Sequence, residues 1–456
     1  MRAAGARITS LFAIPALFAL GGIAARVLLQ RSPPGIAQDL RQPLVVVTAW
    51  GGFGLALWFV LASTVTLCAA ALLLAARRST GTKRLPLSVV ILVAALTQAA
   101  ALSWPVVFSS DVYAYAAYGE LASRGLDPYV PAAAHAGRPL IDAAAWQWGG
   151  HLPVCVYGPV FVGFARALVS ATRAFGAGQT LAALRVVGAL AFSCSIPLFA
   201  GLARRLIPAN AERATLLYGL NPVALWVSAE GHNDALALAV VLAGAFIYSG
   251  TRARTGAVLI ALAAALKASA LVGAGVVALD AWFERDPLRR RRTLVGLGLS
   301  LAVVAALTVP AQWPALRALE LHGRYLPRVS LQALVGIGPA LVAAGVVMLA
   351  GVRVFKLARR SGATWLAGGA WLGLPNPQPW YALWILPAAC LGGGRVAAAV
   401  WLTTIFAVLR YLPDAFGNMS SGPAAVISAL LLTPLALGML VPSAGNPLGA
   451  RRAPAT

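Results

Sequence analysis

The tetrapeptide Gly231-His232-Asn233-Asp234 brings an imidazole and a carboxylate together between two apolar runs, residues 213–229 and 235–248. An ionisable side chain costs about 2.5–3.5 kcal/mol at the centre of a membrane helix. We therefore expect His232 and Asp234 at a water-facing junction between helices, with a function there.

The chain has only 13 acidic residues, which narrows the search for a group that accepts a proton. Those in the basic connectors and at a helix start have ordinary explanations as charge balance or as partners of the helix dipole. Seven fall in segments that we predict below to be external: Asp111, Glu120, Asp127, Asp142, Glu230, Asp234 and Glu320.

Asp111 follows directly on an apolar segment that ends at Trp104–Ser110. At this depth, partial desolvation is expected to raise the pKa of the carboxyl toward that of a usable base. The alternative is that Ser109, Ser110 and Asp111 cap the helix that follows, and the two roles are compatible.

Two further acids have a structural explanation beside the functional one. Asp127 precedes Pro128, a pair that favours a turn. Asp234 is expected either to face back toward Asp111 or to cap a helix over 235–250.

The composition predicts where these groups must sit. Hydrophobic residues make up 60% of the 456, charged residues 11%, and the mean hydropathy is +0.80. Soluble domains carry about 25% charged residues, so we predict an all-α, polytopic bundle of about 12–14 membrane segments, short hairpins included. The clearest apolar runs are 8–29, 44–76, 86–108, 181–203, 213–229, 232–250, 293–310, 329–350, 395–412 and 422–442.

The net charge of +23 does not indicate nucleic-acid binding, because the basic residues gather in short connectors near 77–84, 204–205, 252–254, 285–292 and 353–360. Arginine and lysine in short loops mark the cytoplasmic side of a membrane protein and face anionic lipids. The four cysteines have no metal-ligand spacing, and three lie in apolar runs, which disfavours zinc and disulfides.

With the basic connectors inside, the chain alternates across the membrane. Residues 109–155 and 311–328 are then external, 156–175 form an external amphipathic helix, and run 213–229 leads outward to His232. Residues 255–282, with Lys267 in the middle, are expected to dip in and return as a broken pair. Residues 363–391 are expected to break at the proline-rich segment 375–381. One membrane domain over 1–442 and a loose tail over 443–456 complete the prediction.

Several local strings, in their order along the chain, resemble a known family. They are Ser110-Asp111-Val112-Tyr113-Ala114-Tyr115, Gly125-Leu126-Asp127-Pro128-Tyr129, Tyr157-Gly158-Pro159, the tetrapeptide at 231–234, and Asn376-Pro377-Gln378-Pro379-Trp380-Tyr381. Together they resemble the GT-C superfamily of polytopic glycosyltransferases, and within it the polyprenol-phosphate-mannose-dependent alpha-1,6-mannosyltransferases of mycobacterial-type envelopes. The likeness covers roughly 86–412, which leaves two additional N-terminal helices in 1–85.

The resemblance implies an inverting transfer of mannose from a polyprenyl-phosphate-sugar donor to a mannan or lipid-linked glycan acceptor. The active site would face the extracytoplasmic side of the plasma membrane, among membrane lipids, with no cofactor. No paired acids of the DxD type occur in the external loops, so no metal is expected.

The resemblance also implies roles for particular residues. Asp111 would be the base, with His232 and Asp234 as further catalytic groups. Cations near the leaving phosphate would be His322, Arg324 and Arg328, with Lys267 if its hairpin reaches the cavity. Trp380, Tyr381 and Trp384 would stack on sugar or belong to the aromatic belt of the membrane interface. The remaining predicted substrate-binding residues are Tyr113, Tyr115, Asp127, Tyr157, Asn233 and Gln378.

Three alternatives remain open from the sequence. One is a transporter or flippase of lipid-linked sugars, although inverted repeats with matching polar sites, the usual mark of transporters, are not evident. A second is a GT-C arabinosyltransferase that uses a polyprenyl-phosphate pentose. A third is a polymerase, which would be expected to have arginines in two large loops, whereas one large loop is evident.

Overall fold

A computed structural model describes residues 2–30, 52–77, 85–109, 111–130, 138–147, 152–321, 329–416 and 421–440. Every regular element in these residues is a helix, which confirms the all-α prediction. The longer helices are α1 (Arg2–Gln30), α2 (Gly52–Arg77), α3 (Leu87–Leu102), α7 (Ala177–Leu206), α10 (Asp234–Tyr248), α13 (Pro287–Leu321), α15 (Ile337–Leu357), α16 (Arg359–Leu372) and α20 (Ser421–Leu440).

Shorter helices lie between the long ones along the chain. They are α4 (Asp111–Ser123), α5 (Pro139–Gln147), α6 (Pro159–Thr172), α8 (Ala211–Gly219), α9 (Pro222–Ala229), α11 (Ala253–Ala263), α12 (Leu271–Trp282), α14 (Leu331–Val335), α17 (Ala382–Leu391), α18 (Gly394–Phe406) and α19 (Leu412–Phe416). Single turns of 3-10 helix lie at η1 (Arg173–Phe175), η2 (Ala268–Ala270), η3 (Pro379–Tyr381) and η4 (Ala407–Tyr411).

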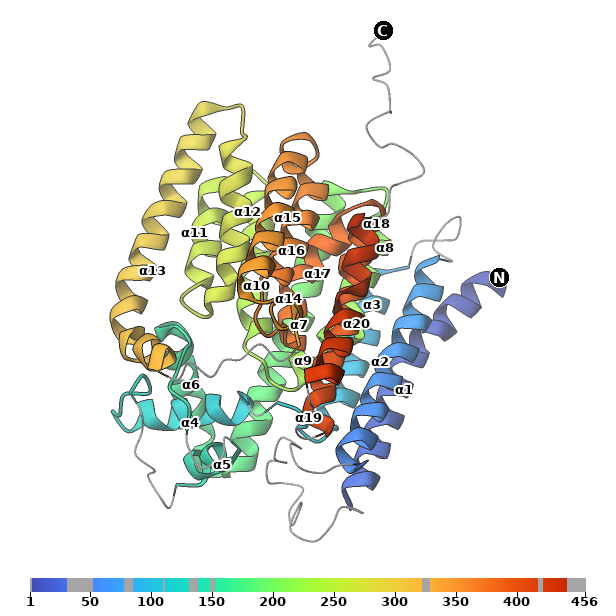
Figure 1. Ribbon diagram of the computed structural model, residues 1–456, viewed down its shortest axis with the longest axis vertical. Coiled ribbons are helices and arrows are strands. Elements are labelled where there is room, and N and C mark those ends of the chain that lie inside the picture. The colour runs from blue at the N-terminus through green and yellow to red at the C-terminus, as the bar shows by residue number, and fades with distance from the viewer. Residues whose placement is uncertain are drawn as a thin grey trace.

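The long helices make this a multi-pass membrane protein. Among the described residues, 7 helices are long and apolar enough to cross a membrane, or 8 if the bent pair α9–α10 forms one span. Four shorter apolar stretches, at Leu87–Leu102, Ala253–Ala263, Ala268–Trp282 and Pro379–Leu391, add to these. Figure 1 shows the long helices running roughly side by side, whereas α4 runs across them at one end of the molecule, close to α5 and α6.

The opposite end carries the basic connectors that follow α7, α10, α12 and α15. Arg205, near the end of α7, donates to Ser249 Oγ (3.1 Å) just after α10. Arg359, at the start of α16, pairs with Asp280 of α12 (3.3 Å). The turns from α12 to α13 and from α15 to α16 lie together at the top of Figure 1, far from α4. Basic connectors thus gather at the end of the bundle opposite α4, as the grouping of basic residues in the sequence predicts.

The N-terminal helices are packed into the bundle rather than set apart from it. Arg7 of α1 forms an ion pair with Glu212 of α8. The indole of Trp104 donates to the carbonyl of Phe18 (2.7 Å), which joins α1 to the segment that leads to Asp111. α1 and α2 therefore support the part of the fold that holds Asp111.

Several predicted helix breaks are present. Residues 264–270 separate α11 from α12 with Lys267 between them, and residues 373–378 separate α16 from η3. The amphipathic segment is helical as α6, and it buries Phe161, Val162, Ala165 and Val169 along one face.

Three predicted boundaries are wrong. Run 213–229 is two short helices, because the side chain of Asn221 caps α9 at Ala224 N (3.0 Å) and Pro222 begins a new helix. Run 293–310 belongs to a longer helix, because α13 continues as far as Leu321. Run 329–350 breaks at Gly336, whose φ of 87° ends α14.

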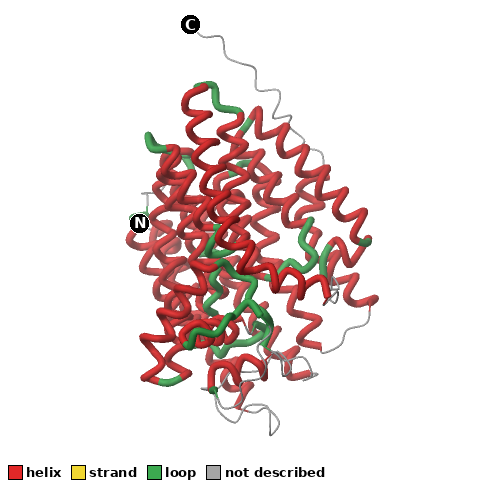
Figure 2. The backbone as a smooth tube through the Cα atoms, turned by 90° about the vertical axis from the view of Figure 1, so that its left-hand side faces the viewer, coloured by secondary structure: helices red, strands yellow, loops and turns green. Residues whose placement is uncertain are grey.

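Sharp backbone turns place the polar residues. α9 and α10 meet at 120°. Gly231 lies in this bend with φ 92°, and a Cβ there would meet the side chain of Val112 at 3.0 Å. Phe108 has φ 66°, the only positive φ of a non-glycine residue among those described, and it turns the chain from α3 into α4. Figure 2 shows that some of the loop segments lie among the helices rather than at the ends of the bundle.

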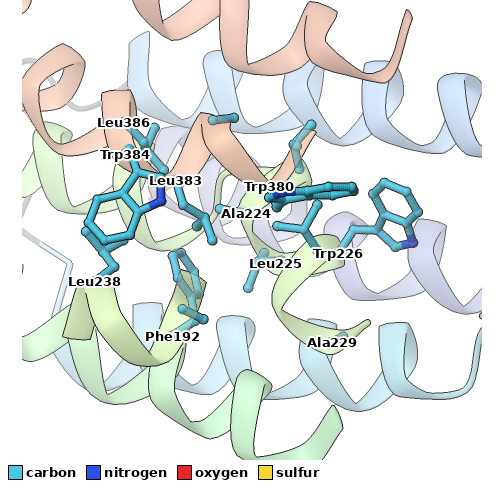
Figure 3. Close-up of a cluster of buried hydrophobic side chains, with 14 of the residues drawn as sticks. Phe192, Ala224, Leu225, Trp226, Ala229, Leu238, Trp380, Leu383, Trp384 and Leu386 are labelled. Carbon is cyan, nitrogen blue, oxygen red and sulfur yellow. The ribbon is translucent and has the colours of Figure 1, made fainter. Parts of the chain in front are cut away.

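Buried aromatic side chains surround this bend. α9 packs against η3 and α10 against α17. Figure 3 shows the side chains at these two contacts, Trp226 with Trp380 and Leu238 with Trp384. Because lipid tails are as apolar as these side chains, such contacts stabilise the bundle through close packing.

Candidate active site

Asp111 is the first residue of α4 and lies against the α9–α10 bend. The hydroxyl of Tyr115, one turn later on the same helix, is 3.2 Å from Asp111 Oδ2 and 3.2 Å from Asn233 Oδ1. A phenol has one proton to donate, so Tyr115 can satisfy one of these acceptors at a time. Tyr115 thus connects the helix that carries Asp111 to the tetrapeptide at 231–234.

His232 lies between two carboxylates. Its Nδ1 is 3.6 Å from Asp111 Oδ2, and its Nε2 is 3.8 Å from Glu230 Oε2. The imidazole stacks on the indole of Trp380, with ring centroids 4.2 Å apart and planes at 20°. Both ring nitrogens of His232 and both carboxylate oxygens of Glu230 are buried without a hydrogen-bond partner. We call Asp111, His232 and Glu230 the Asp111 half of the site.

Lys267 and Asp234 form a second group. Lys267 Nζ donates to Asp234 Oδ2 (2.5 Å) and to Asn233 Oδ1 (2.9 Å). The other oxygen of Asp234 accepts from the indole of Trp384 (2.6 Å). We call Lys267, Asp234 and Trp384 the Lys267 half; every polar group in it has a partner.

Aromatic rings cover the ammonium group of Lys267. Its Nζ is 5.3 Å from the ring centre of Tyr157 and 5.9 Å from that of Tyr381, within the range of cation–π attraction. The hydroxyl of Tyr157 is 3.4 Å from that of Tyr115. Gly158 permits this arrangement, because a Cβ there would lie 2.0 Å from the carbonyl oxygen of Ala265. The Tyr157-Gly158-Pro159 motif therefore brings a tyrosine onto the loop that carries Lys267.

Exposure distinguishes the three acids. The side chain of Asp111 is 13% exposed, that of Glu230 is 2% and that of Asp234 is 0%. A carboxylate can take a proton from a substrate only where the substrate reaches it. Asp111 is the acid that meets this condition.

The pKa of Asp111 departs from the expected direction. Burial alone would raise it, as we predicted from the sequence. The charge of His232 close by, and then Lys267 and the hydroxyl of Tyr115, outweigh burial and lower the pKa of Asp111 below its ordinary value. The prediction of a raised pKa is therefore wrong, because it counted desolvation and omitted the cations that only the fold brings near. Asp111 is ionised at neutral pH.

The structure brings together most of the residues that the sequence singled out. One connected cluster contains Asp111, Tyr115, Tyr157, His232, Asn233, Asp234, Trp380 and Tyr381. One of the two expectations for Asp234 was that it faces Asp111. That expectation is wrong, because Asp234 pairs with Lys267. It is also not the cap of α10, since Asn233 precedes the helix and no side-chain cap is formed.

Other predicted residues lie elsewhere. Asp127 is exposed and accepts from the backbone N–H of Tyr129 (2.8 Å), which is the turn that its position before Pro128 favours. Tyr113 is buried near Arg185 and Glu230. Gln378 precedes Trp380 by two residues, and its buried Oε1 has no hydrogen-bond partner. His322, Arg324 and Arg328 lie outside the described residues.

Two residues of the cluster were not among the predicted site residues, although the sequence holds a signal for each. Glu230 directly precedes the tetrapeptide, and the signal for it was an acid at the end of an apolar run. Because His232 lies between Glu230 and Asp111, Asp111 has another acid near it in space, although none is near it in sequence. Lys267 was expected only if its hairpin reached the site, and a lone lysine inside an apolar run was the signal.

The described residues contain no group of three or more His, Cys, Asp or Glu side chains arranged to hold a metal ion. The donor set around His232 instead consists of two acids, one imidazole and the hydroxyl of Tyr115. These groups can accept, donate and orient protons.

Comparison with known proteins places this geometry in context. The model of the family described as alpha-(1→6)-mannopyranosyltransferase, N-terminal domain, matches residues 12–283, which include the whole cluster except η3 and α17. Alpha-(1→6)-mannopyranosyltransferase A of Mycobacterium tuberculosis is 28% identical over an alignment covering 70% of this chain and 68% of that protein. None of the solved structures matches the chain.

Proposed function

The chain belongs to the alpha-(1→6)-mannopyranosyltransferase family, and on that premise we propose that it transfers mannose from a polyprenyl-phosphate donor to a hydroxyl of a mannan or glycolipid acceptor, in alpha-1,6 linkage. It is a mannosyltransferase of the membrane, which favours the enzyme over the transporter alternative. The donor, the inversion and the acceptor are the parts that we propose.

In the proposed reaction, the oxygen of the acceptor hydroxyl forms a bond to the anomeric carbon of the mannose. The bond from that carbon to the phosphate oxygen breaks, and its electron pair stays on the polyprenyl phosphate. The hydroxyl proton passes to a carboxylate. Attack from the side opposite the leaving group inverts the anomeric centre.

Asp111 carries this proposal. Its carboxylate is ionised and more exposed than those of Glu230 and Asp234, so it is the acid that can accept the hydroxyl proton. Positioned general bases contribute about 10²–10⁴-fold to such reactions. His232, held between Asp111 and Glu230, acts by orienting Asp111 and by balancing its charge.

Lys267 is the group that we assign to the leaving phosphate. An ammonium group has three donors, and Asn233 and Asp234 use two of them. The third can meet a phosphate oxygen as negative charge develops on it, which is where a fixed cation stabilises a transition state most. Asp234 then serves to hold Lys267 in place rather than to accept a proton.

The site is proposed to open on the extracytoplasmic side of the plasma membrane. The basic connectors gather at the end of the bundle opposite α4. If that end is cytoplasmic, as the distribution of arginine favours, then α4 and Asp111 lie outside. A polyprenyl chain would then lie in the outer leaflet beside the site.

The test is a transfer assay with purified protein in liposomes. We expect product from polyprenyl-phosphate mannose and a mannan oligosaccharide, with the alpha configuration at the new linkage and an unchanged rate in the presence of a chelator. Nucleotide-activated mannose and a polyprenyl-phosphate pentose serve as alternative donors. Transfer from either of these in place of polyprenyl-phosphate mannose would overturn the proposed donor.

A further inference from the structure

A cavity of about 310 Å³ lies at the far end of α4, away from Asp111. It is an open cavity lined by α4, α5, the end of α6 with η1, and the beginning of α7. Its walls include Glu120, Arg124, Leu140, Val169, Arg173 and Thr180. Neither half of the active site contributes to it. A rise of roughly 1.5 Å per residue puts Glu120 about 14 Å from Asp111 along α4.

Glu120 shows that the cavity is suited to a ligand. The residue is 7% exposed, and its Oε1 accepts from both Nε (3.2 Å) and Nη2 (2.8 Å) of Arg124. Its Oε2 is buried and has no hydrogen-bond partner. A buried carboxylate oxygen without a partner is costly, and a hydroxyl donor entering the cavity would remove that cost.

The opposite wall offers hydrogen-bond donors. α7 begins at Gly176–Ala177 without a side-chain cap, so the first backbone N–H groups of a 30-residue helix lie at the cavity without helical partners. Arg173 also lines the cavity and has no ion pair among the described residues. Leu140 and Val169 add apolar surface between the two polar walls.

This combination favours a neutral ligand with many hydroxyl groups. The free oxygen of Glu120 needs a hydrogen-bond donor, which a fully ionised anion does not supply, whereas Arg173 and the helix N-terminus disfavour a cation. A sugar ring has hydroxyls that donate to Glu120 and accept from the α7 wall, and an apolar face for Leu140 and Val169.

We propose that this cavity binds an internal sugar residue of the acceptor glycan, while the end of the same glycan reacts at Asp111. The proposal rests on the proposed function and extends it, because it makes the enzyme prefer acceptors long enough to reach from Asp111 to Glu120. Shorter acceptors react without using the cavity.

The experiment compares kcat/KM for Glu120→Gln with two acceptors, mannobiose and a long mannan oligosaccharide. We expect about a tenfold loss with the long acceptor, mainly through KM, which is the loss of one hydrogen bond to a charged group. The rate with mannobiose should change by less than twofold. Glu284→Gln is the matched control, because it removes a glutamate paired with an arginine (Arg289, 3.6 Å) at the opposite end.

A second variant covers the case that Glu120→Gln perturbs the fold. Ala177→Trp fills the cavity from the α7 side without altering the Glu120–Arg124 pair, and it should also weaken the long acceptor selectively. Thermal unfolding measured for each variant separates folding from binding. A loss equal for both acceptors in a stably folded variant would overturn the proposal.

Two controls separate this proposal from its premise. Absence of transfer by the wild-type protein to both acceptors would refute the proposed function itself, whereas normal transfer with no length-dependent loss in the variants would refute the cavity alone. Competition by inorganic phosphate against the long acceptor but not against mannobiose would identify an anion site and overturn the sugar assignment.

Discussion

The two halves of the active site are built from adjacent residues but differ in how well their polar groups are satisfied. In the Lys267 half, Asp234 accepts from Lys267 at 2.5 Å and from Trp384 at 2.6 Å. In the Asp111 half, His232 and Glu230 have buried atoms without hydrogen-bond partners. Buried polar atoms are rarely left so, and their presence marks where a substrate or water completes the site.

The difference suggests a division of roles. A network in which every polar group has a partner holds the ammonium of Lys267 at a fixed place, and the third N–H of that ammonium is left for the departing phosphate. An unsaturated network leaves capacity for protons to move, which suits a base. Tyr115 and Asn233 together link the two halves, because Tyr115 contacts Asp111 and Asn233, and Asn233 accepts from Lys267.

The largest effect is expected from Asp111→Asn. The amide preserves the shape but cannot take the proton, so kcat should fall by about 10²–10⁴-fold with normal folding. Transfer measured with polyprenyl-phosphate mannose tests this, and Asp286→Asn at the opposite end is the control. Turnover near the wild-type level would move the base to another residue.

Lys267→Met comes next, because it leaves Asp234 buried and unpaired. Breaking a buried pair from one side costs about 3–5 kcal/mol, so thermal unfolding should shift strongly and transfer should be lost. Adding Asp234→Leu should restore much of the stability but not the transfer. Recovery of transfer in the double variant would show that Lys267 has no role at the phosphate.

His232→Gln addresses the pH dependence of the Asp111 half. The rate requires ionised Asp111 and is lost as the pH falls through the pKa of that carboxyl, which His232 helps to lower. Without His232, only Lys267 and Tyr115 oppose the effect of burial on the pKa of Asp111, so the acid limb of kcat/KM should move to higher pH. An acid limb that stays in place would separate His232 from Asp111.

The smallest effect is expected from Trp384→Phe. The phenyl ring fills only part of the space of the buried indole and removes the N–H that donates to Asp234, a hydrogen bond to a charged group worth about 1.5–3 kcal/mol. The free energy of unfolding should fall by at least that amount while kcat changes little, since Lys267 still holds Asp234. A large loss of kcat with unchanged stability would place Trp384 at the substrate.

Much of this protein follows from its sequence alone. Apolar runs and basic connectors are local properties, so the all-helical membrane bundle, the broken pair around Lys267 and the break at 375–381 could be predicted from them. Asp111, His232 and Asp234 could be singled out because charge is rare and costly in such a chain. The Asn221 cap and the proline that follows it at Pro222 were enough to make the predicted helix over 213–229 wrong.

Only the tertiary structure decided how the charges are paired. Asp234 pairs with Lys267, which is 33 residues away in the sequence, and His232 lies between Glu230 and Asp111. These pairings depend on the 120° bend at Gly231 and on the close approach of Gly158 to Ala265. They reverse the expected pKa shift of Asp111, because a pKa depends on every charge nearby in space, and neighbours in space are not neighbours in sequence.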